Sequence, residues 1–401
     1  MICNAVRAGL KVGITAVSHK VIRNLLDETV LASREAGFTI SCVQKVREKA
    51  LDNHSEAITE TEDNGEVFAL LLSGQAQVAA GTAWLWSREE AAQSVDVLFV
   101  DEAGQISLAN TLAISQAAKS VVLLGDPQQL EQPKRGSHPD GTDVSALEHL
   151  LGDHQTMPPN RGLFLETTWR LHPSICKFTS ELFYESRLES RDGLDVQQIQ
   201  GDTPFAGSGL FFVPVEHEGN CNESLEEVAA VAKIVAQLTR EGMSWINQHG
   251  TQQPVTLEDI LVVAPYNAHV ASLLEQLPEG ARVGTVDRFQ GQEAPVVIYS
   301  MSTSSPELAP RGMEFLYSAS RLNVATSRAR CICILVANPK LFEPECRTPQ
   351  QMKLANAFCR YLELAQPAEK QVTNRLTVLD TGEDSTHDKL LDTLRRTKEG
   401  D

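Results

Sequence analysis

The stretch "VDVLFVDEAGQ" (residues 95–105) decides the fold class. It is an apolar run that ends in two adjacent carboxylates, Asp101 and Glu102. Runs of this kind are typical of strands that are buried on both faces of a parallel sheet. Ligands of such sheets bind at the carboxyl edge, just beyond the last residues of the strands. The stretch therefore predicts an α/β protein with a polar site directly after this strand.

A second stretch of the same design follows, "SVVLLGDPQQL" (residues 120–130), with Gln129 close to its end. Similar runs, each bounded by turn residues, occupy residues 12–15, 210–213, 260–264, 296–300 and 332–337. Amphipathic stretches separate these runs. Alternation of strands and helices predicts parallel sheets with covering helices.

The clearest of the predicted helices spans "SLEEVAAVAKIVAQLTR" (residues 224–240). Ser224 followed by Glu227 predicts a capping box at its start. The apolar residues that share one face of this helix are Leu225, Val228, Ala232, Val235 and Leu238.

The chain has 401 residues, which favours two domains. The segment 152–162, "GDHQTMPPNRG", combines glycines with two adjacent prolines and is the best candidate for a linker. We therefore expect a first α/β domain over 1–157 and a second over 158–366. Residues 367–401 are polar and charged and are expected to form a C-terminal tail.

The charge balance narrows the class of function. The formal net charge of −18 excludes a protein that holds nucleic acid by its overall charge. A local basic groove remains compatible with it, because residues 1–50 hold eight Lys and Arg against four acids. The sequence has no stretch long and apolar enough to span a membrane. The eight scattered cysteines, without a C-x-x-C pair, favour a reduced, cytoplasmic protein over a zinc protein.

The polar strand ends carry the candidate chemistry of the first half. An acid at such an edge can hold Mg²⁺ through water, and its neighbour can activate the attacking water. Asp101 and Glu102 have this arrangement, and Gln129 is suited to sense a γ-phosphate. The plainer alternatives are a helix cap at Asp101-Glu102 and an ordinary turn at Gly125-Asp126-Pro127.

Three stretches of the second half add aromatic and basic residues. "TTWRLHP" (167–173) offers Trp169 for base stacking beside Arg170 for phosphate. A loop with Gly291 and Glu293 lies between two predicted strands. "SRLNVATSRARCICILVA" (320–337) is expected to place Arg321, Arg328 and Arg330 on a helix, with Arg321 and Arg328 on one face. For each stretch taken alone, a solvated basic surface is the alternative.

In their order along the chain, these stretches resemble the motifs of superfamily 1 helicases, in the branch that includes the nonsense-mediated-decay helicase. "VDEAG" resembles the Walker B motif, "GDPQQL" motif III, "WRLHP" motif IV, "VDRFQGQE" motif V and "LNVATSRAR" motif VI. "VGITAVSHKVIRNLL" is similar to motif Ia, and "AAGTAWLW" (79–86) to the single-strand contact that follows it. The resemblance covers about residues 10–340. Among bacterial proteins it is closest to the helicase part of RecB-like nuclease–helicase proteins, which implies an upstream nuclease domain as a partner.

The resemblance implies two RecA-like domains that close on ATP and Mg²⁺ and move along single-stranded nucleic acid, DNA rather than RNA, in the 5′ to 3′ direction. The catalytic residues that it implies are Glu102, Gln129, Arg170 and Arg328. The cofactor-binding residues are Asp101, which holds Mg²⁺ through water, Trp169, Gly291, Glu293 and Tyr266. The nucleic-acid-binding residues are Ser18, His19, Thr82 and Trp84.

One expected motif has no match in the sequence. Family members hold ATP on a G-x-x-x-x-G-K-[ST] loop, and "GSHPDGTD" (136–143) lacks the Lys-Ser/Thr pair. The loop belongs upstream of motif Ia, so we expect the first domain to lack this loop and its strand, as in a fragment or a truncated gene. The strand at 121–124 would then lie at a sheet edge, and nucleotide turnover would be weak.

Two functions therefore stay open. The first is an ATP-dependent helicase or translocase module. The second is a non-enzymatic remnant that binds nucleic acid or a partner protein. A small-molecule α/β enzyme is disfavoured, because neither G-x-G-x-x-G nor G-x-S-x-G is present.

Overall fold

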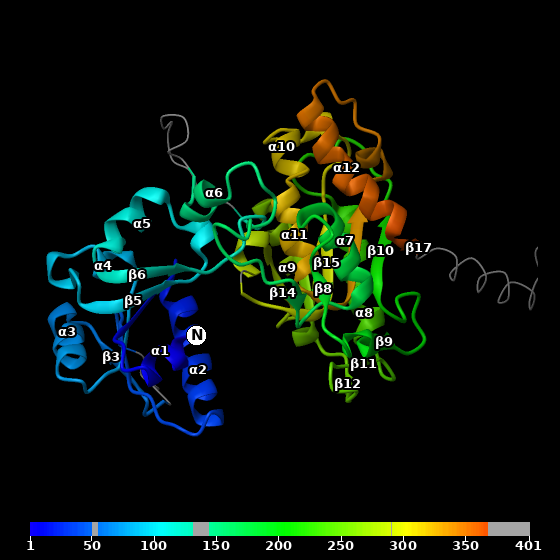
Figure 1. Ribbon diagram of the computed structural model, residues 1–401. Helices are drawn as coiled ribbons and strands as arrows, with labels where there is room; N and C mark the ends of the chain where they lie inside the picture. Colours follow the sequence, from blue (N-terminus) through cyan, green and yellow to red (C-terminus); the bar gives the residue numbers. More distant parts are fainter. Residues whose placement is uncertain (50–54, 131–143, 290, 368–401) are drawn as a thin grey trace, which may run out of the picture. The chain divides into compact units, whose positions relative to one another are not determined.

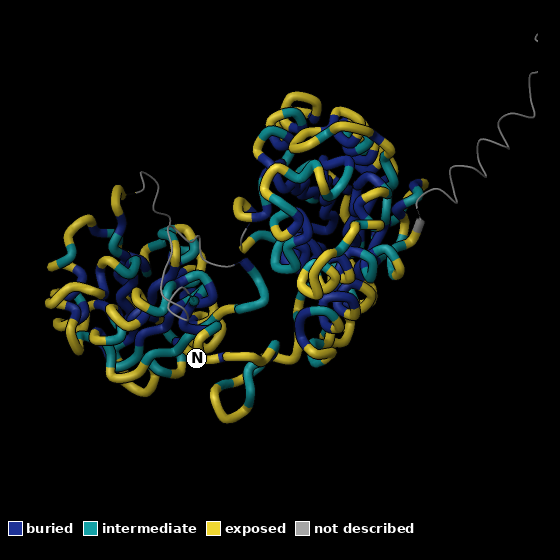
Figure 2. Tube along the Cα trace, turned by 90° about the horizontal axis from the view of Figure 1, so that it is seen from above, coloured by how far each residue is buried: buried dark blue, intermediate teal, exposed yellow. Residues whose placement is uncertain are grey.

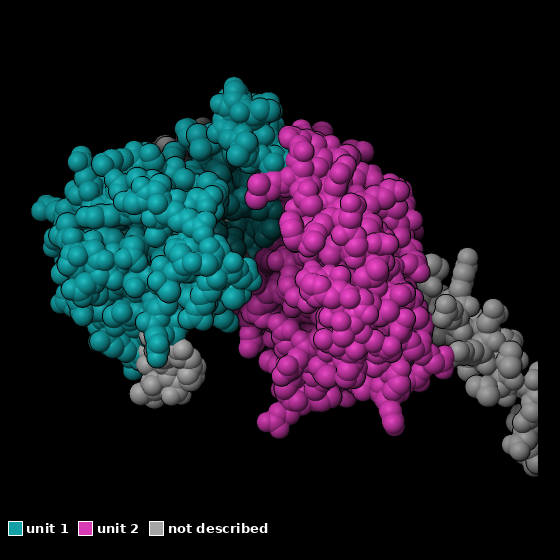
Figure 3. Space-filling view, turned by 60° about the horizontal axis from the view of Figure 1, so that its bottom comes forward, with its two compact units in different colours: residues 1–164 teal, residues 165–401 magenta. Residues whose placement is uncertain are grey.

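The computed structural model describes residues 1–49, 55–130, 144–289 and 291–367. The chain divides into two compact units, Met1–Phe164 and Leu165–Asp401, which Figure 3 colours separately. This division falls seven residues after the end of the first domain that the sequence suggests. Most of the expected tail, residues 368–401, lies outside the described residues.

Unit 1 is built on a six-stranded, all-parallel sheet with the strand order β3-β2-β4-β1-β5-β6. Its strands are β1 (Val12–Thr15), β2 (Cys42–Lys45), β3 (Ile58–Thr61), β4 (Val78–Ala80), β5 (Val95–Val100) and β6 (Ala118–Leu123). Its α-helices are α1 (Ile2–Arg7), α2 (His19–Glu35), α3 (Asn64–Leu72), α4 (Ala83–Trp86), α5 (Leu108–Ser115) and α6 (Ala146–Leu151). Within the described residues β6 lies at one edge of the sheet, the position expected for residues 121–124.

Both faces of this sheet are covered, because successive side chains of a strand point to opposite faces. Ile14 packs with Ile22 and Leu26 of α2 in one buried cluster. Leu98 packs with Trp86 of α4 in the other. Figure 2 shows the buried residues of both units in dark blue, gathered in the interior of each unit.

Unit 2 contains a second all-parallel six-stranded sheet with the order β14-β13-β15-β16-β10-β17. Figure 1 labels β14, β15, β10 and β17 of this sheet. Its strands are β10 (Gly209–Pro214), β13 (Ile260–Ala264), β14 (Arg282–Thr285), β15 (Ala294–Ser300), β16 (Ala329–Ala337) and β17 (Gln366–Pro367). Two small additions are the parallel pair β7 (Thr167–Thr168) and β8 (Glu189–Ser190), and the antiparallel sheet of β9 (Gln198–Gln200), β11 (Ser244–Ile246) and β12 (Gln252–Pro254).

Helices cover both faces of the second sheet as well. The α-helices of unit 2 are α7 (Pro173–Phe183), α8 (Leu225–Leu238), α9 (Asn267–Gln276), α10 (Met313–Leu316), α11 (Ala319–Ser327) and α12 (Pro349–Leu364). Val231 of α8 and Leu273 of α9 join the core formed with Val262 and Ile298. From α12, the Tyr361 hydroxyl donates to the backbone oxygens of β10 and β16. The predicted α/β class with two parallel-sheet units is thereby confirmed.

The helix predicted at 224–240 is present as α8, but its capping box is only half formed. The Ser224 hydroxyl accepts a hydrogen bond from the Glu227 backbone N–H at 3.1 Å. The Glu227 side chain does not return to the backbone of Ser224. It is buried and accepts hydrogen bonds from the Ser300 hydroxyl at 2.6 Å and the Ser302 N–H at 2.9 Å. Leu225 is exposed, so the predicted apolar face begins at Val228.

No helix in the described part of the chain is long and apolar enough to cross a membrane. All eight cysteines are unpaired, and four of them, Cys42, Cys176, Cys331 and Cys333, are buried.

Candidate functional site

The carboxyl edge of the first sheet gathers most of the residues predicted for unit 1. Strands β4, β1, β5 and β6 are neighbours in that order and run parallel. Their carboxyl ends therefore lie at the same edge of the sheet. The loops that follow them carry Thr82, Ser18, Asp101 and Gln129, respectively.

Asp101 and Glu102 are fixed by the turn that follows β5. One Asp101 carboxylate oxygen accepts a hydrogen bond from the Glu102 backbone N–H at 3.0 Å. Burial raises the pKa of Asp101, and this hydrogen bond partly opposes the rise. Glu102 has left-handed backbone, with φ at 51°, which is costly for a residue other than glycine. Such strain is typical of functional turns, because the surrounding structure must hold it in place.

Two glycines let the loop of Gln129 lie directly against this turn. A Cβ on Gly104 would stand 2.9 Å from the Asp126 carbonyl oxygen, and one on Gly125 would stand 2.8 Å from the Ala103 nitrogen. Gly125 also has φ of 151°. The Gln129 side chain donates to the Asp126 carboxylate at 2.9 Å. The structure thus brings the loops of Asp101, Glu102 and Gln129 into backbone contact.

The residues predicted to bind single-stranded nucleic acid lie at the starts of two helices. Ser18 is the N-cap of α2, and its hydroxyl accepts from the Val21 N–H at 3.3 Å. His19 follows it, and desolvation, with the charge of Lys45, lowers its pKa. Thr82 is the N-cap of α4. Trp84 projects from α4 with 84% of its surface exposed, an unusual state for so large an apolar side chain.

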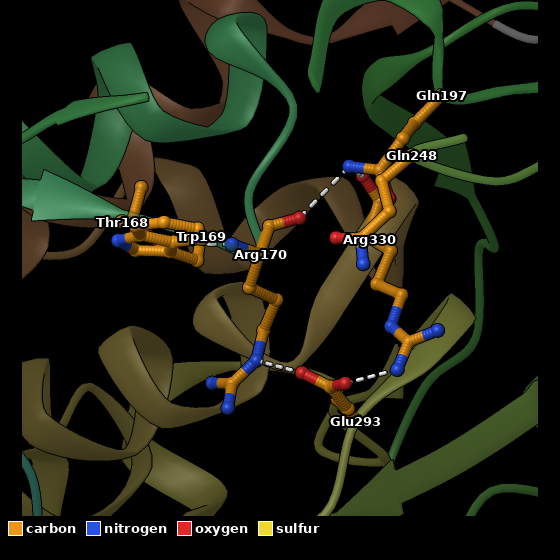
Figure 4. Close-up of a pocket in the computed structure, with 7 residues that line it drawn as sticks. All are labelled: Thr168, Trp169, Arg170, Gln197, Gln248, Glu293 and Arg330. Carbon is orange, nitrogen blue, oxygen red and sulfur yellow. Dashed lines mark hydrogen bonds and ion pairs between the residues drawn. The ribbon is translucent and has the colours of Figure 1, made fainter. Parts of the chain in front are cut away.

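A cavity of about 410 Å³ lies in unit 2, near the amino ends of β15 and β16. Figure 4 shows the residues that line it, which are Thr168, Trp169, Arg170, Gln197, Gln248, Glu293 and Arg330. Three of the residues predicted for the nucleotide, Trp169, Arg170 and Glu293, are brought together here.

Glu293 lies between two guanidinium groups in this cavity. One carboxylate oxygen pairs with Arg170 Nε and the other with Arg330 Nη2 (Figure 4). Burial alone would raise the pKa of Glu293, but the two arginines outweigh it, and the pKa lies below its ordinary value. The carboxylate is therefore ionised at neutral pH. Two positive charges and one negative charge leave the cavity cationic, as a site for phosphate groups requires.

Gln197 holds the backbone of both arginines. Its side chain is 1% exposed, and its Nε2 donates to the Arg170 carbonyl at 2.9 Å and the Arg330 carbonyl at 3.4 Å. Sequence reasoning missed Gln197 and Gln248, and no motif marks either of them. It did single out Arg330 as a basic residue, but the predicted location was wrong. Arg330 lies in β16 rather than on a helix, because α11 ends at Ser327.

Three predicted residues are outside the lining of this cavity. Arg328 is the C-cap of α11 and only 4% exposed. Gly291 has left-handed backbone, with φ at 71°, in the loop just before Glu293. Tyr266 follows the carboxyl end of β13, and its ring packs at 5.4 Å from that of Phe315. Tyr266 therefore lies at the opposite edge of the sheet from the amino ends of β15 and β16.

The described residues contain no cluster of three or more His, Cys, Asp and Glu side chains that could hold a metal ion. A divalent ion at the carboxyl edge of the first sheet would have to be held by Asp101 together with water and the phosphates of a nucleotide.

Comparison with known proteins gives an independent view of the chain. Residues 142–340 match a family model described as an AAA domain. The DNA polymerase alpha-associated DNA helicase A of Schizosaccharomyces pombe is 28% identical over 265 residues, which are 62% of this chain and 38% of that protein. The regulator of nonsense transcripts 1 homolog of Arabidopsis thaliana is 30% identical over 263 residues, 62% of this chain and 20% of that protein.

A further relative, the probable helicase MAGATAMA 3 of Arabidopsis thaliana, is 25% identical over 387 residues, 90% of this chain and 42% of that protein. The chain thus spans less than half the length of these relatives. Among solved structures, an Arterivirus nonstructural protein 10 (helicase) in complex with DNA aligns with a TM-score of 0.45 at 14% identity, covering 88% of this chain and 59% of that one. The family model and the curated relatives agree with the motif order and support a superfamily 1 helicase of the branch that includes the nonsense-mediated-decay helicase.

Proposed function

We propose that this chain is an ATP-dependent helicase or translocase module that acts on single-stranded nucleic acid, DNA rather than RNA, in the 5′ to 3′ direction. The observation that carries the proposal is the cationic cavity of unit 2, where Trp169 and Arg170 are adjacent residues. An exposed indole and two guanidinium groups suit a ligand with an aromatic base and a chain of phosphates. A cytoplasmic location, in keeping with eight unpaired cysteines, is part of the proposal.

Each residue of unit 2 has a proposed part in holding the nucleotide. Arg170 and Arg330 bind phosphate oxygens, and Glu293 turns from them to the ribose hydroxyls. Trp169 stacks on the base. Arg328, buried at the end of α11, is assigned by resemblance as a second phosphate-facing arginine, and its carbonyl accepts from the Ala294 N–H at 3.0 Å. Gly291 gives the loop before Glu293 its left-handed turn, and Tyr266 is assigned to the nucleotide by resemblance alone.

At the edge of the first sheet, the proposed roles are proton transfer and charge stabilisation. Asp101 would hold Mg²⁺ through water, and one of its carboxylate oxygens accepts a hydrogen bond from the Glu102 N–H. Mg²⁺, when bound, neutralises phosphate charge during hydrolysis. Glu102 accepts the proton of the attacking water, and Gln129 orients the same water.

Strand binding is proposed for Ser18, His19, Thr82 and Trp84. The exposed indole of Trp84 supports this, because an aromatic face can stack with any base regardless of sequence. Ser18 is the N-cap of α2, whose amino-terminal backbone N–H groups favour phosphate.

Hydrolysis of ATP with and without a single-stranded oligonucleotide tests the proposal. We expect the wild-type chain to hydrolyse ATP faster when the oligonucleotide is present. E102Q should abolish this hydrolysis and still bind the oligonucleotide. Stimulated hydrolysis that survives in E102Q would contradict the assigned base.

The second candidate is a strand-binding protein without turnover. The observation that favours it is the sequence itself, in which no G-x-x-x-x-G-K-[ST] pattern occurs. The same experiment separates the two, because this candidate predicts strand binding with no hydrolysis above background.

A further inference from the structure

The indole of Trp169 has a cation stacked on it from a neighbouring strand. The Arg191 guanidinium carbon lies 4.0 Å from the centroid of the Trp169 ring. Trp169 nevertheless keeps 64% of its surface exposed. The indole is therefore open to a ligand although Arg191 lies over its ring.

The register of a short strand pair sets this contact. In the parallel pair of β7 and β8, Thr168 is the partner of Ser190, and the Arg191 N–H donates to the Thr168 carbonyl at 3.0 Å. The next residues along the two strands are Trp169 and Arg191. The backbone thus places them side by side, so their stacking does not depend on the tip of a flexible loop.

Arg191 has no ion pair with a carboxylate in the described parts of the chain, and its side chain is exposed. Its neighbour Arg187 differs, because it pairs with Glu166 at 2.8 Å. A long, charged side chain loses conformational freedom when it lies along a ring. The compensating interaction for Arg191 is the attraction between its charge and the π-system of the indole.

We infer that Arg191 is a positioning residue for nucleobase binding: it fixes the plane of Trp169, so that a purine nucleoside phosphate can stack on the indole with its phosphates on Arg170 and Arg330. This inference rests on the proposed nucleotide-binding role of the cavity. Purines are favoured because stacking grows with the overlap of the two ring systems.

The consequence is a separation between base and phosphate recognition. Without Arg191 the Trp169 ring can change its orientation, which weakens binding of the base, whereas Arg170 and Arg330 continue to bind phosphate. Exposed cation–π pairs are worth about 0.5–1 kcal/mol, so the expected loss of affinity is about twofold to fivefold.

The test measures the affinities of ADP, CDP and inorganic pyrophosphate for the full chain by isothermal titration calorimetry. We expect R191A to weaken ADP binding about twofold to fivefold and to leave pyrophosphate binding unchanged, with a smaller effect on CDP. R191K should lie between wild type and R191A, because an ammonium keeps the charge but not the flat guanidinium. R187A is the matched control and should leave all three affinities unchanged.

Equal losses of ADP and pyrophosphate affinity in R191A, or no loss of either, would overturn the inference. If the wild-type protein binds neither ADP nor pyrophosphate, the proposed function is wrong, and a purine nucleoside phosphate is not the ligand of the cavity. The positioning claim is then decided separately by acrylamide quenching of Trp169 fluorescence, taken as the difference between each protein and its W169F counterpart. R191A should make Trp169 more accessible to acrylamide, and unchanged quenching would overturn the positioning role.

Discussion

At the scale of single residues, Trp84 and Trp86 of α4 show how position decides the part an indole plays. Trp84 is exposed, whereas Trp86 is fully buried and donates to the backbone oxygens of Ile14 and Gly81. Burial and hydrogen bonding make Trp86 part of the core. Sequence alone does not separate the two, because both belong to the same short motif.

We predict that W84A weakens binding of a single-stranded oligonucleotide about tenfold, because one stacked base is worth about 1–3 kcal/mol. The melting temperature should stay unchanged, since the side chain packs on little else. Fluorescence anisotropy of a labelled strand measures the first effect, and circular dichroism the second. W86A is the contrasting variant and should lower the free energy of unfolding by about 3–5 kcal/mol. Undiminished strand binding by W84A would remove this residue from the interface.

Arg170 and Arg330 give a prediction for the cavity of unit 2. R170A should weaken ADP binding about tenfold or more, because charge-assisted hydrogen bonds to phosphate are about twice as strong as neutral ones. R330A should act in the same direction. R360A is the control, since Arg360 pairs on the surface with Glu181 and Glu363, away from the cavity lining. Titration calorimetry measures the affinities, and equal values for R170A and R360A would contradict the assignment.

His269 gives a prediction about acid stability. It is buried, its Nδ1 accepts from the Ser224 N–H, and its Nε2 shares a hydrogen bond with the Ser300 hydroxyl at 2.7 Å. Desolvation lowers its pKa to about 4. The unfolded chain takes up a proton near pH 6.5, well before the folded chain does. Stability is therefore complete above about pH 6.5 and falls as the pH decreases from there towards 4.

The loss over that range should be about 2–3 kcal/mol for this group. Melting temperatures measured at several values between pH 7.5 and 4.5 test it against H269Q. We expect H269Q to be less stable at pH 7.5 and to lose less stability on acidification than wild type. Parallel pH curves for the two proteins would show that His269 does not titrate in this way.

At the scale of elements, the strands were the most predictable part of the fold. All seven apolar runs fall in or overlap strands of the two parallel sheets, because burial on both faces demands continuous apolar sequence. The small strands β7, β8, β9, β11 and β12 were not predicted. They are two or three residues long, too short for any periodicity, and are set by contacts between distant segments.

The residues of the candidate site likewise include some that the sequence predicted and some that it did not. Trp169, Arg170 and Glu293 could be predicted because they belong to motifs with a recognisable order. Gln197 could not, because its role depends on two backbone carbonyls that are distant in sequence. Glu227 was misjudged since the local signal for a capping box competes with a buried hydroxyl and N–H group that only the folded chain supplies.

The contact between the loops after β5 and β6 yields a prediction at this scale. G104A places a methyl group 2.9 Å from the Asp126 carbonyl oxygen, so the two loops must separate. We expect a loss of about 1–3 kcal/mol in the free energy of unfolding, as is usual for overpacking. G74A is the control, because Gly74 has the left-handed backbone that strains alanine but open space around its Cβ position. Urea denaturation measures both, and nucleotide hydrolysis, if present, should fall in G104A alone.

At the scale of the whole molecule, charge distribution reconciles an acidic protein with a nucleic-acid ligand. The net charge of −18 coexists with eight Lys and Arg against four acids in residues 1–50. Binding through such local basic regions releases counterions from the strand. It therefore weakens steeply as salt rises.

Strand binding through such basic regions is tested by the affinity for a labelled single-stranded oligonucleotide, measured at about 50 and about 200 mM salt. We predict binding that falls at least tenfold between the two concentrations and that W84A weakens at both. Absence of binding at 50 mM salt, or an affinity that does not change with salt, would contradict the account.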